Sequence, residues 1–175
     1  MQRPHPFAAR PRRLLRLLLP ALAAVVLAAC GGGKAPPVKI DVPEPPPPTR
    51  LVIDASASAR LNANASGSPA PLVVRIYELA DGGRFLGSGF FPLYESERAT
   101  LAEDLLARDE IRFAPGESRT IEKTLNPGTT TLGVLAAYRS TEQRRWRATA
   151  PIVPETVNRF TLDLGPRELT LTPAP

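Results

Sequence analysis

Apolar and polar residues alternate with a period of two along much of the chain after residue 50. From Leu51 onward, Leu51, Ile53, Ala55, Ala57 and Ala59 would fall on one side of an extended strand. The segments 72–79 and 132–138 are almost continuously apolar, as central strands buried on both faces are. Proline, glycine and asparagine turn signals separate these segments, so the pattern predicts a mainly β sandwich of about seven to eight strands. The same alternation recurs at Ile121, Leu125, Phe160, Leu162, Leu164, Leu169 and Leu171.

Residues 81–112 depart from this period and predict a small helical insertion. Thr100 and Glu103 have the spacing of a helix-capping box, and Asp104 lies four residues before Arg108, as in helical ion pairs. An amphipathic helix near residues 100–108 is therefore expected. Its apolar side would consist of Leu101, Leu105 and Leu106. A second helical or irregular segment packed on the sheet is expected at Phe90, Phe91, Leu93 and Tyr94.

The N-terminal segment has the pattern of a secretory signal with a lipoprotein cleavage box. An arginine-rich start precedes an apolar run that ends in Leu27-Ala28-Ala29-Cys30. The run after Arg16 is shorter than the roughly 20 residues of a membrane span, which disfavours the alternative of a transmembrane anchor. We therefore expect cleavage of residues 1–29 and lipid attachment at Cys30. Gly31, in place of an Asp retention signal, favours the outer membrane, facing the periplasm.

Residues 30–50 predict an extended tether between the lipid and the domain. The stretch begins with three glycines after Cys30 and contains seven prolines, which cannot continue a helix or donate to a sheet. At about 3.1 Å per residue, such a chain reaches at most roughly 60 Å. A docking motif for a proline-reading module is the alternative. The folded domain is then expected at residues 51–173.

Charge and composition exclude most catalytic chemistry from the domain. Five of the 22 Lys and Arg residues precede Cys30, so the remaining 17 balance the 17 acids. This neutral body gives no reason to expect nucleic acid as a partner. The only His and the only Cys are His5 and Cys30, which removes His-containing zinc sites and Ser-His or Cys-His nucleophile pairs. We predict no catalytic residue, no metal site, no cofactor other than covalent lipid and no small-molecule substrate.

Two groups of residues invite a different interpretation. Three carboxylate pairs suggest acid–base chemistry, but neighbours along a helix do not face one another, so solvated carboxylates are predicted. The run from Arg144 to Arg147 mixes cations with Trp146, as nucleic-acid surfaces do. In a strand, however, Trp146 would point inward and Arg145 and Arg147 outward, so a core tryptophan with solvated arginines is favoured. The carboxylate pairs are Glu95 with Glu97, Glu103 with Asp104, and Asp109 with Glu110.

The loop from Leu61 to Pro71 is the candidate binding element. It is rich in Asn, Ser, Gly and Pro, and it is longer than the two to about five residues of ordinary hairpin loops. A solvated connection without function is one interpretation. The other is a recognition loop, since binding residues concentrate on loops carried by a rigid sheet.

A series of motifs in a fixed order gives the chain a family resemblance. After the lipoprotein box and the alternating strand come Leu61-Asn62, Gly67, the run from Pro71 to Leu79, Phe91-x-Leu93-Tyr94, Asp104-Leu105-Leu106, Pro115-Gly116, the run from Leu132 to Arg139, and Trp146-Arg147. In this order and spacing the chain resembles the outer-membrane lipoproteins of the type VI secretion system, the TssJ (VasD, SciN) family.

The resemblance implies a transthyretin-like β-sandwich that acts as a non-catalytic assembly subunit. Members bind the periplasmic C-terminal region of the inner-membrane protein TssM, within a TssJ-TssL-TssM complex. The family's contact loop maps onto Asn62, Ala63, Asn64, Ala65, Ser66, Gly67 and Ser68. The alternative is a periplasmic lipoprotein with a carbohydrate-binding or cell-wall-modifying role.

Overall fold

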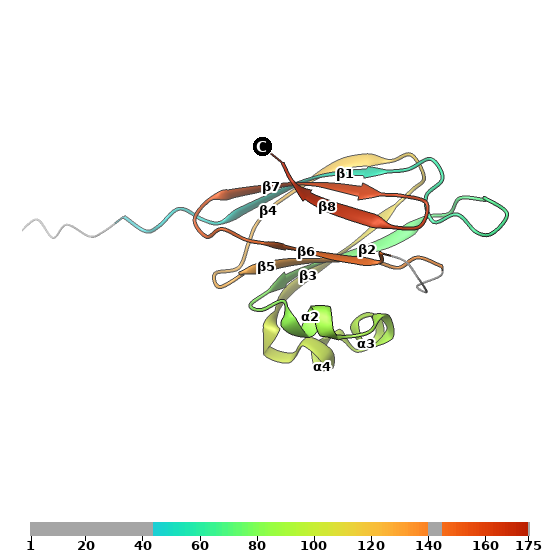
Figure 1. The fold of residues 1–175 in the computed structure, drawn as a ribbon. Coiled ribbons are helices and arrows are strands. Elements are labelled where there is room, and N and C mark those ends of the chain that lie inside the picture. Colours follow the sequence, from blue (N-terminus) through green and yellow to red (C-terminus); the bar gives the residue numbers. More distant parts are fainter. Residues whose placement is uncertain (1–43, 140–144, 175) are drawn as a thin grey trace, which may run out of the picture. The chain divides into compact units, whose positions relative to one another are not determined.

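A computed structural model describes residues 44–139 and 145–174, which form two four-stranded sheets packed face to face (Figure 1). The first sheet has the order β4-β1-β7-β8 and the second the order β3-β2-β5-β6. This confirms the predicted mainly β sandwich with a small helical insertion. The first sheet comprises β1 (Arg50–Ala57), β4 (Ser118–Thr124), β7 (Val157–Leu164) and β8 (Leu169–Pro173). The second comprises β2 (Leu72–Leu79), β3 (Leu105–Phe113), β5 (Thr131–Ala136) and β6 (Arg147–Pro151).

The main core lies between the two sheets and is built from the alternating residues that the sequence singled out. On β1, Leu51, Ile53, Ala55 and Ala57 are buried, and β7 contributes its own alternating set. The predicted continuation to Ala59 is wrong. Strand β1 ends at Ala57 and the chain turns, so the side chain of Ala59 is exposed. As predicted, β2 and β5 are central strands, with the main core on one face and the helices on the other.

Strand directions give the sandwich two distinct ends. β1 is parallel to β7, and the other paired strands are antiparallel. We call one end the loop pole; it carries the connections 58–71, 114–117 and 165–168 and the described residues 137–139 and 145–146. The other end, the tether pole, carries the connections 80–82, 125–130 and 152–156 together with residues 44–49. In Figure 1 the loop that follows β1 projects at one end, and the chain enters β1 at the opposite end.

Three short helices cover the outer face of the second sheet (Figure 1). They are α2 (Gly83–Gly87), α3 (Phe90–Glu95) and α4 (Glu97–Leu101), followed by a 3₁₀ turn, η2 (Ala102–Asp104). The helical segment expected at residues 90–94 is confirmed. Gly133 on β5 permits this close packing, because an added Cβ would lie 3.1 Å from Leu79 Cδ1 and 3.3 Å from Phe85 Cζ. The second core consists of Tyr77, Leu79, Phe85, Leu93, Leu101 and Leu135.

The amphipathic helix predicted near residues 100–108 is wrong, and the helical insertion ends earlier than residue 112. Thr100 lies inside α4 and is no cap, since its Oγ1 donates to the carbonyl oxygens of Pro92 and Ser96. Ala102, at φ 48°, ends α4; the 3₁₀ turn η2 follows, and Leu105 begins β3. Eight of the nine residues of β3 pair with β2, a partner distant in sequence that local spacing does not reveal. Tertiary pairing therefore overrides the helical pattern.

Trp146 and Arg147 also differ from expectation. Trp146 is half-buried and packs against both cores, and Arg145 is exposed as predicted. Arg147, predicted to be solvated, is instead half-buried, and its Nη1 donates to the carbonyl oxygens of Phe85 (2.8 Å) and Ser88 (2.5 Å). This guanidinium satisfies backbone acceptors near the end of α2, which have no partner within the helix.

The described residues bear on the ends of the predicted domains only in part. Arg50, counted with the tether, is the first residue of β1, and β8 ends at Pro173. Among residues 44–139 and 145–174, no helix is long and apolar enough to cross a membrane. The predicted signal peptide, Cys30 and most of the tether lie outside the described residues.

Candidate partner-binding surface

Asn62 fixes the base of the candidate loop. Its backbone lies in the left-handed region at φ 49°, which asparagine tolerates better than most residues. Its Nδ2 donates to the carbonyl oxygen of Pro71 (3.0 Å), and its Oδ1 accepts from the backbone N–H of Arg139 (2.9 Å). The side chain thus joins the two ends of the loop to the connection after β5. Asn62 and Ala63 are only 5% and 8% exposed, so these two predicted contact residues serve as anchors.

The tip of the loop, residues 64–68, is a closed turn organised by Asn64. The Oδ1 of Asn64 accepts from the backbone N–H of Ser68 and from the hydroxyl of Ser66, both at 2.8 Å. The Asn64 backbone exchanges hydrogen bonds with Ser68 and Gly67, and Gly67 adopts φ 83°. Ala65, Ser66 and Ser68 are exposed, while Asn64 and Gly67 are half-buried. The predicted contact surface thus narrows to these five residues, which carry no charge.

Neighbouring loops brace this element from three sides. The backbone N–H of Ala63 donates to the carbonyl oxygen of Pro166, and that of Gly116 donates to Ser58. The buried Tyr138 donates its hydroxyl hydrogen to the carbonyl oxygen of Glu168 (2.6 Å), which ties the connection after β5 to the turn between β7 and β8. The described part of the loop pole is therefore held by internal hydrogen bonds before any partner binds, which lowers the ordering cost of binding there.

At the tether pole, hydrogen bonds of Thr49 hold the incoming chain on the domain. The carbonyl oxygen of Thr49 accepts from Leu125 N–H, and its Oγ1 accepts from Glu155 N–H. Pro46, Pro47 and Pro48 lie along a recess of about 350 Å³ beside the connections 125–130 and 152–156. The chain thus leaves the folded domain at the pole opposite to the candidate loop.

A buried carboxylate, Glu78, binds the connection 125–130 and Lys123 at the tether pole. The Oε2 of Glu78, a residue 1% exposed, accepts from the backbone and side chain of Asn126. Its Oε1 accepts no conventional hydrogen bond but lies 2.5 Å from Lys123 Nζ, which also contacts Asp109. Burial alone would raise the pKa of Glu78, but the hydrogen bonds from Asn126 and the ion pair with Lys123 outweigh burial and lower it. Since Lys123 is on β4, the cluster also joins the two sheets along one open edge.

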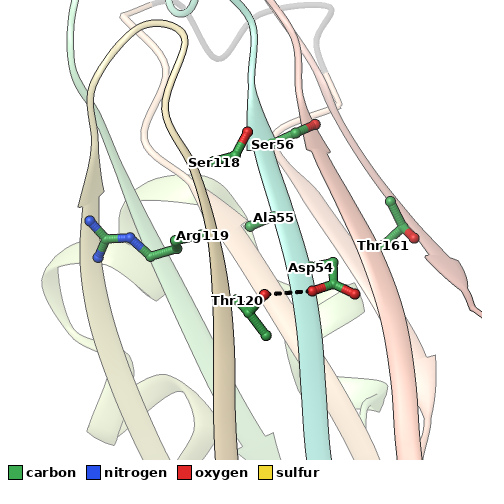
Figure 2. Close-up of a pocket in the computed structure, with 7 residues that line it drawn as sticks. All are labelled: Asp54, Ala55, Ser56, Ser118, Arg119, Thr120 and Thr161. Atoms are coloured by element: carbon green, nitrogen blue, oxygen red, sulfur yellow. Dashed lines mark hydrogen bonds between the residues drawn. The ribbon is translucent and has the colours of Figure 1, made fainter.

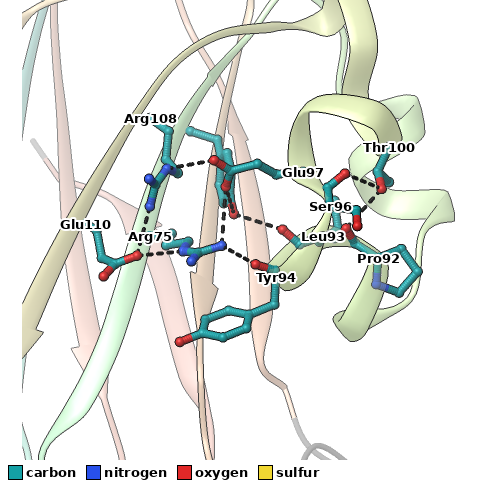
Figure 3. A network of polar contacts seen from close by, with 10 residues as sticks. Arg75, Pro92, Leu93, Tyr94, Ser96, Glu97, Thr100, Arg108 and Glu110 are labelled. Carbon is teal, nitrogen blue, oxygen red and sulfur yellow. Dashed lines mark hydrogen bonds and ion pairs between the residues drawn. The ribbon is translucent and has the colours of Figure 1, made fainter.

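A second polar network fixes the helices to the second sheet, as Figure 3 shows. Arg75 contacts Glu110 (2.8 Å) and Glu97 (3.3 Å) and donates to the carbonyl oxygen of Tyr94 (2.7 Å). Arg108 pairs with the same two carboxylates, so cations and anions alternate around a ring. Burial raises the pKa of Tyr77, whose hydroxyl donates to Glu97, to about 12. This tyrosine is therefore a neutral hydrogen-bond donor.

The predicted solvation holds for Glu95, Glu103 and Glu110, which are exposed, and is wrong for Glu97 and Asp104, whose side chains are largely buried. Only Glu95 is exposed without an ion pair among the described residues. The other five each contact a cation: Glu97 and Glu110 join the ring above, Glu103 and Asp104 contact Arg84, and Asp109 contacts Lys123. Glu95 and Glu97 both line one shallow recess of about 400 Å³ beside α4, but Glu97 is already engaged by Arg75 and Arg108, so these acids chiefly hold structural elements together.

The outer face of the first sheet has a shallow recess of about 390 Å³, shown in Figure 2. Its polar side chains come from β1, β4 and β7, and the Thr120 hydroxyl donates to Asp54 Oδ1 (2.7 Å). Asp54 is the only carboxylate of this lining, so the recess lacks the paired acids of a glycosidase. Within the described ranges, no cluster of three or more His, Cys, Asp or Glu residues could hold a metal ion.

Residues 49–167 match the family described as type VI secretion lipoprotein (T6SS-SciN; VasD, EvfM, TssJ). The chain belongs to this family. The lipoprotein TssJ1 of Pseudomonas aeruginosa is 36% identical, with a TM-score of 0.72 over 74% of this chain and 98% of that chain. This TssJ-family chain is thus a type VI secretion lipoprotein with the family's fold.

Two further solved structures resemble this TssJ-family chain. One, described as a type VI membrane complex, is 28% identical with a TM-score of 0.63 over 71% of this chain and 98% of that chain. The other, described as the T6SS protein TssM C-terminal domain from EAEC, is 27% identical with a TM-score of 0.56 over 72% of this chain and 99% of that chain. No curated protein matches the chain in sequence.

Sequence reasoning found the loop but missed the polar network that fixes the helices to the second sheet. Length and composition identified the loop from Leu61 to Pro71, and the family resemblance narrowed it to residues 62–68; in the structure the tip of this loop projects at one pole. Sequence reasoning did not identify Arg75 and Glu97 as partners, because they lie on different elements and meet only when α4 packs on β2. The available signal was Arg75 itself, a charged residue within the apolar run 72–79 of a predicted central strand.

Proposed function

We propose that the chain is an outer-membrane lipoprotein that captures the periplasmic region of a TssM-like inner-membrane protein. In this proposal it is a non-catalytic assembly subunit of the TssJ-TssL-TssM complex. The observation that carries the proposal is the separation of the two poles: the chain enters at one end of a rigid sandwich and the candidate loop projects from the other. A protein built in this way joins a membrane on one side to a partner on the other.

The membrane end of the proposal rests on the sequence. Residues 1–29 would be removed by the lipoprotein peptidase, and Cys30 would carry the lipid. Three acyl chains exceed the two signals needed for stable anchoring, at about 0.8 kcal/mol per buried methylene. Residues 31–49 would act as the tether, and the bonds of Thr49 keep its last residues at the tether pole.

The partner end of the proposal rests on the geometry of residues 64–68. This tip is uncharged, exposed and held in one conformation by Asn64, Gly67 and the three bracing loops. The similarity to structures described as a type VI membrane complex and as a TssM C-terminal domain supports a TssM-type partner.

A bulky substitution at the tip tests the partner end. Ala65 is exposed and its side chain has no structural role in the turn, so Ala65→Trp should leave the domain folded and obstruct docking. We expect at least a tenfold weaker Kd for the TssM periplasmic region, measured by biolayer interferometry, which corresponds to about 1.4 kcal/mol. Ala99→Trp, at an exposed alanine on α4, is the matched control and should bind normally. Equal binding by both variants would show that the partner contacts a surface other than the loop.

Lipid attachment tests the membrane end. Cells fed a palmitate analogue should label the protein, and the label should be lost in Cys30→Ala. Fractionation should place the labelled protein with the outer membrane and the variant in the soluble periplasm. Labelling of the Cys30→Ala variant at the normal level would contradict the lipid assignment.

A further inference from the structure

We propose that the loop pole recognises an acidic protein surface and that four arginines around the candidate loop attract this partner. The proposal rests on the proposed function, since it names the chemistry of the partner's contact surface. The four residues are Arg60, Arg139, Arg145 and Arg167, and all are exposed.

Backbone hydrogen bonds place these arginines around the base of the loop. Arg60 directly precedes Leu61 within the loop. The backbone N–H of Arg139 donates to the side chain of Asn62, so this residue lies beside the loop's anchor. Arg167 follows Pro166, whose carbonyl oxygen accepts from Ala63.

The fourth arginine completes the group from the side of β8. The carbonyl oxygen of Arg145 accepts from the backbone N–H of Leu169, two residues beyond Arg167. The four cations therefore come from three connections that meet at one pole. They lie around the base of the loop, whose tip, residues 64–68, carries no charge.

The two poles have charges of opposite sign. In the described part of the loop-pole connections the four arginines face two acids, Glu117 and Glu168. Glu117 is paired with Arg119 of β4, so its negative charge does not offset the four arginines. The sequence of residues 140–144 adds one acid and one base. The tether-pole segments carry three acids and no Lys or Arg: Glu44, Asp81 and Glu155.

The four arginines are also free of the ion pairs that occupy other cations. Arg50, Arg75, Arg84, Arg108, Arg119 and Lys123 all contact carboxylates. Within residues 44–139 and 145–174, the loop-pole arginines form no such pair. A guanidinium without an internal partner can pair with a carboxylate of another molecule at no cost to the fold.

An acidic protein fits this pole better than an anionic bilayer does. The described chain on the lipid side enters at the opposite, acidic pole, so the arginines lie at the end of the domain away from the tether. Exposed charges at the rim of an interface chiefly accelerate association, because their field guides the partner before contact. The arginines should therefore act on the on-rate and the loop tip on the off-rate.

The experiment compares two sets of charge reversals in the full-length protein purified in detergent. The test variant carries Arg60→Glu, Arg139→Glu, Arg145→Glu and Arg167→Glu. The control carries Arg98→Glu and Arg159→Glu, which are exposed, unpaired among the described residues and distant from the loop pole. A neutral version of the test variant, with Gln at the four positions, separates lost attraction from added repulsion. Circular dichroism checks that each variant is folded.

Stopped-flow association with the TssM periplasmic region is then measured across ionic strengths, with vesicles of phosphatidylglycerol as a second probe. We expect the glutamate variant to associate at least tenfold more slowly at low salt, the glutamine variant to be intermediate, and the salt dependence to weaken in that order. The control should resemble the wild type.

Each other outcome has a definite meaning. If the wild type and all variants associate at the same rate and with the same salt dependence, the acidic partner surface is excluded and the proposed function stands. If the wild type does not bind the TssM region at all, the proposed function fails and this inference fails with it. If the four arginines control vesicle binding but not TssM association, they bind anionic lipid, and the inference is overturned.

Discussion

Replacement of Asn62 by alanine should destabilise the domain, because this side chain supports the candidate loop from inside. Asn62→Ala removes the donor to Pro71 O and the acceptor for Arg139 N–H. Each hydrogen bond contributes about 1 kcal/mol, and more where a buried partner is left unsatisfied. Alanine at φ 49° adds about 1 kcal/mol of backbone strain that asparagine largely avoids. We expect a total loss of about 3 kcal/mol.

Asn62→Gly separates the two contributions. Glycine loses the same hydrogen bonds but adopts a positive φ freely, while it gains freedom in the unfolded chain. It should therefore be milder than alanine by about 0.5–1 kcal/mol. Urea unfolding gives both values, and with a slope of about 2 kcal/mol/M the alanine midpoint should fall by about 1.5 M.

The measured order of these variants decides whether the structural reasoning holds. Loss of less than about 1 kcal/mol in Asn62→Ala would mean that the two hydrogen bonds do not brace the loop. A glycine variant less stable than the alanine variant would refute the assigned backbone strain. Because the tip is attached to this anchor, both variants should also bind the partner less tightly.

Three further changes test the buried carboxylate of the tether pole and the packing of the helices on the second sheet. The lowered pKa of Glu78 means that its charged form stabilises the fold above the ordinary glutamate value and that this contribution is lost as pH falls; Glu78→Gln should therefore weaken the acid dependence of urea unfolding, and an unchanged dependence would exclude the role. Gly133→Ala should cost about 1–3 kcal/mol in thermal unfolding, because its Cβ would press on Phe85; a variant as stable as the wild type would show that the helices can shift. Arg75→Ala should cost about 2–3 kcal/mol, and the exposed, unpaired control Arg98→Ala less than about 0.5 kcal/mol; equal losses would contradict the network.

The sequence indicated the sandwich because its signal is local. A strand half-buried on a sheet repeats every two residues, so β1 and β7 are visible in the order of their own residues. The apolar runs of β2 and β5 likewise identified the central strands. β3 was missed because Asp104 and Arg108 have the spacing of a helical ion pair, whereas the strand depends on its pairing with β2, which local spacing does not reveal.

The sequence by itself predicted the lipoprotein signal, and it determined the absence of His and Cys from the domain and the existence of a long polar loop. Tertiary structure decided which loop residues are available: pairing with Arg139 and Pro71 turned Asn62 inward, whereas Ala65 remained exposed. It also decided that the chain enters opposite to the loop and that four arginines, unpaired among the described residues, gather at one pole. Composition and local periodicity do not encode distances between residues far apart in the chain, and the charge of a surface depends on those distances.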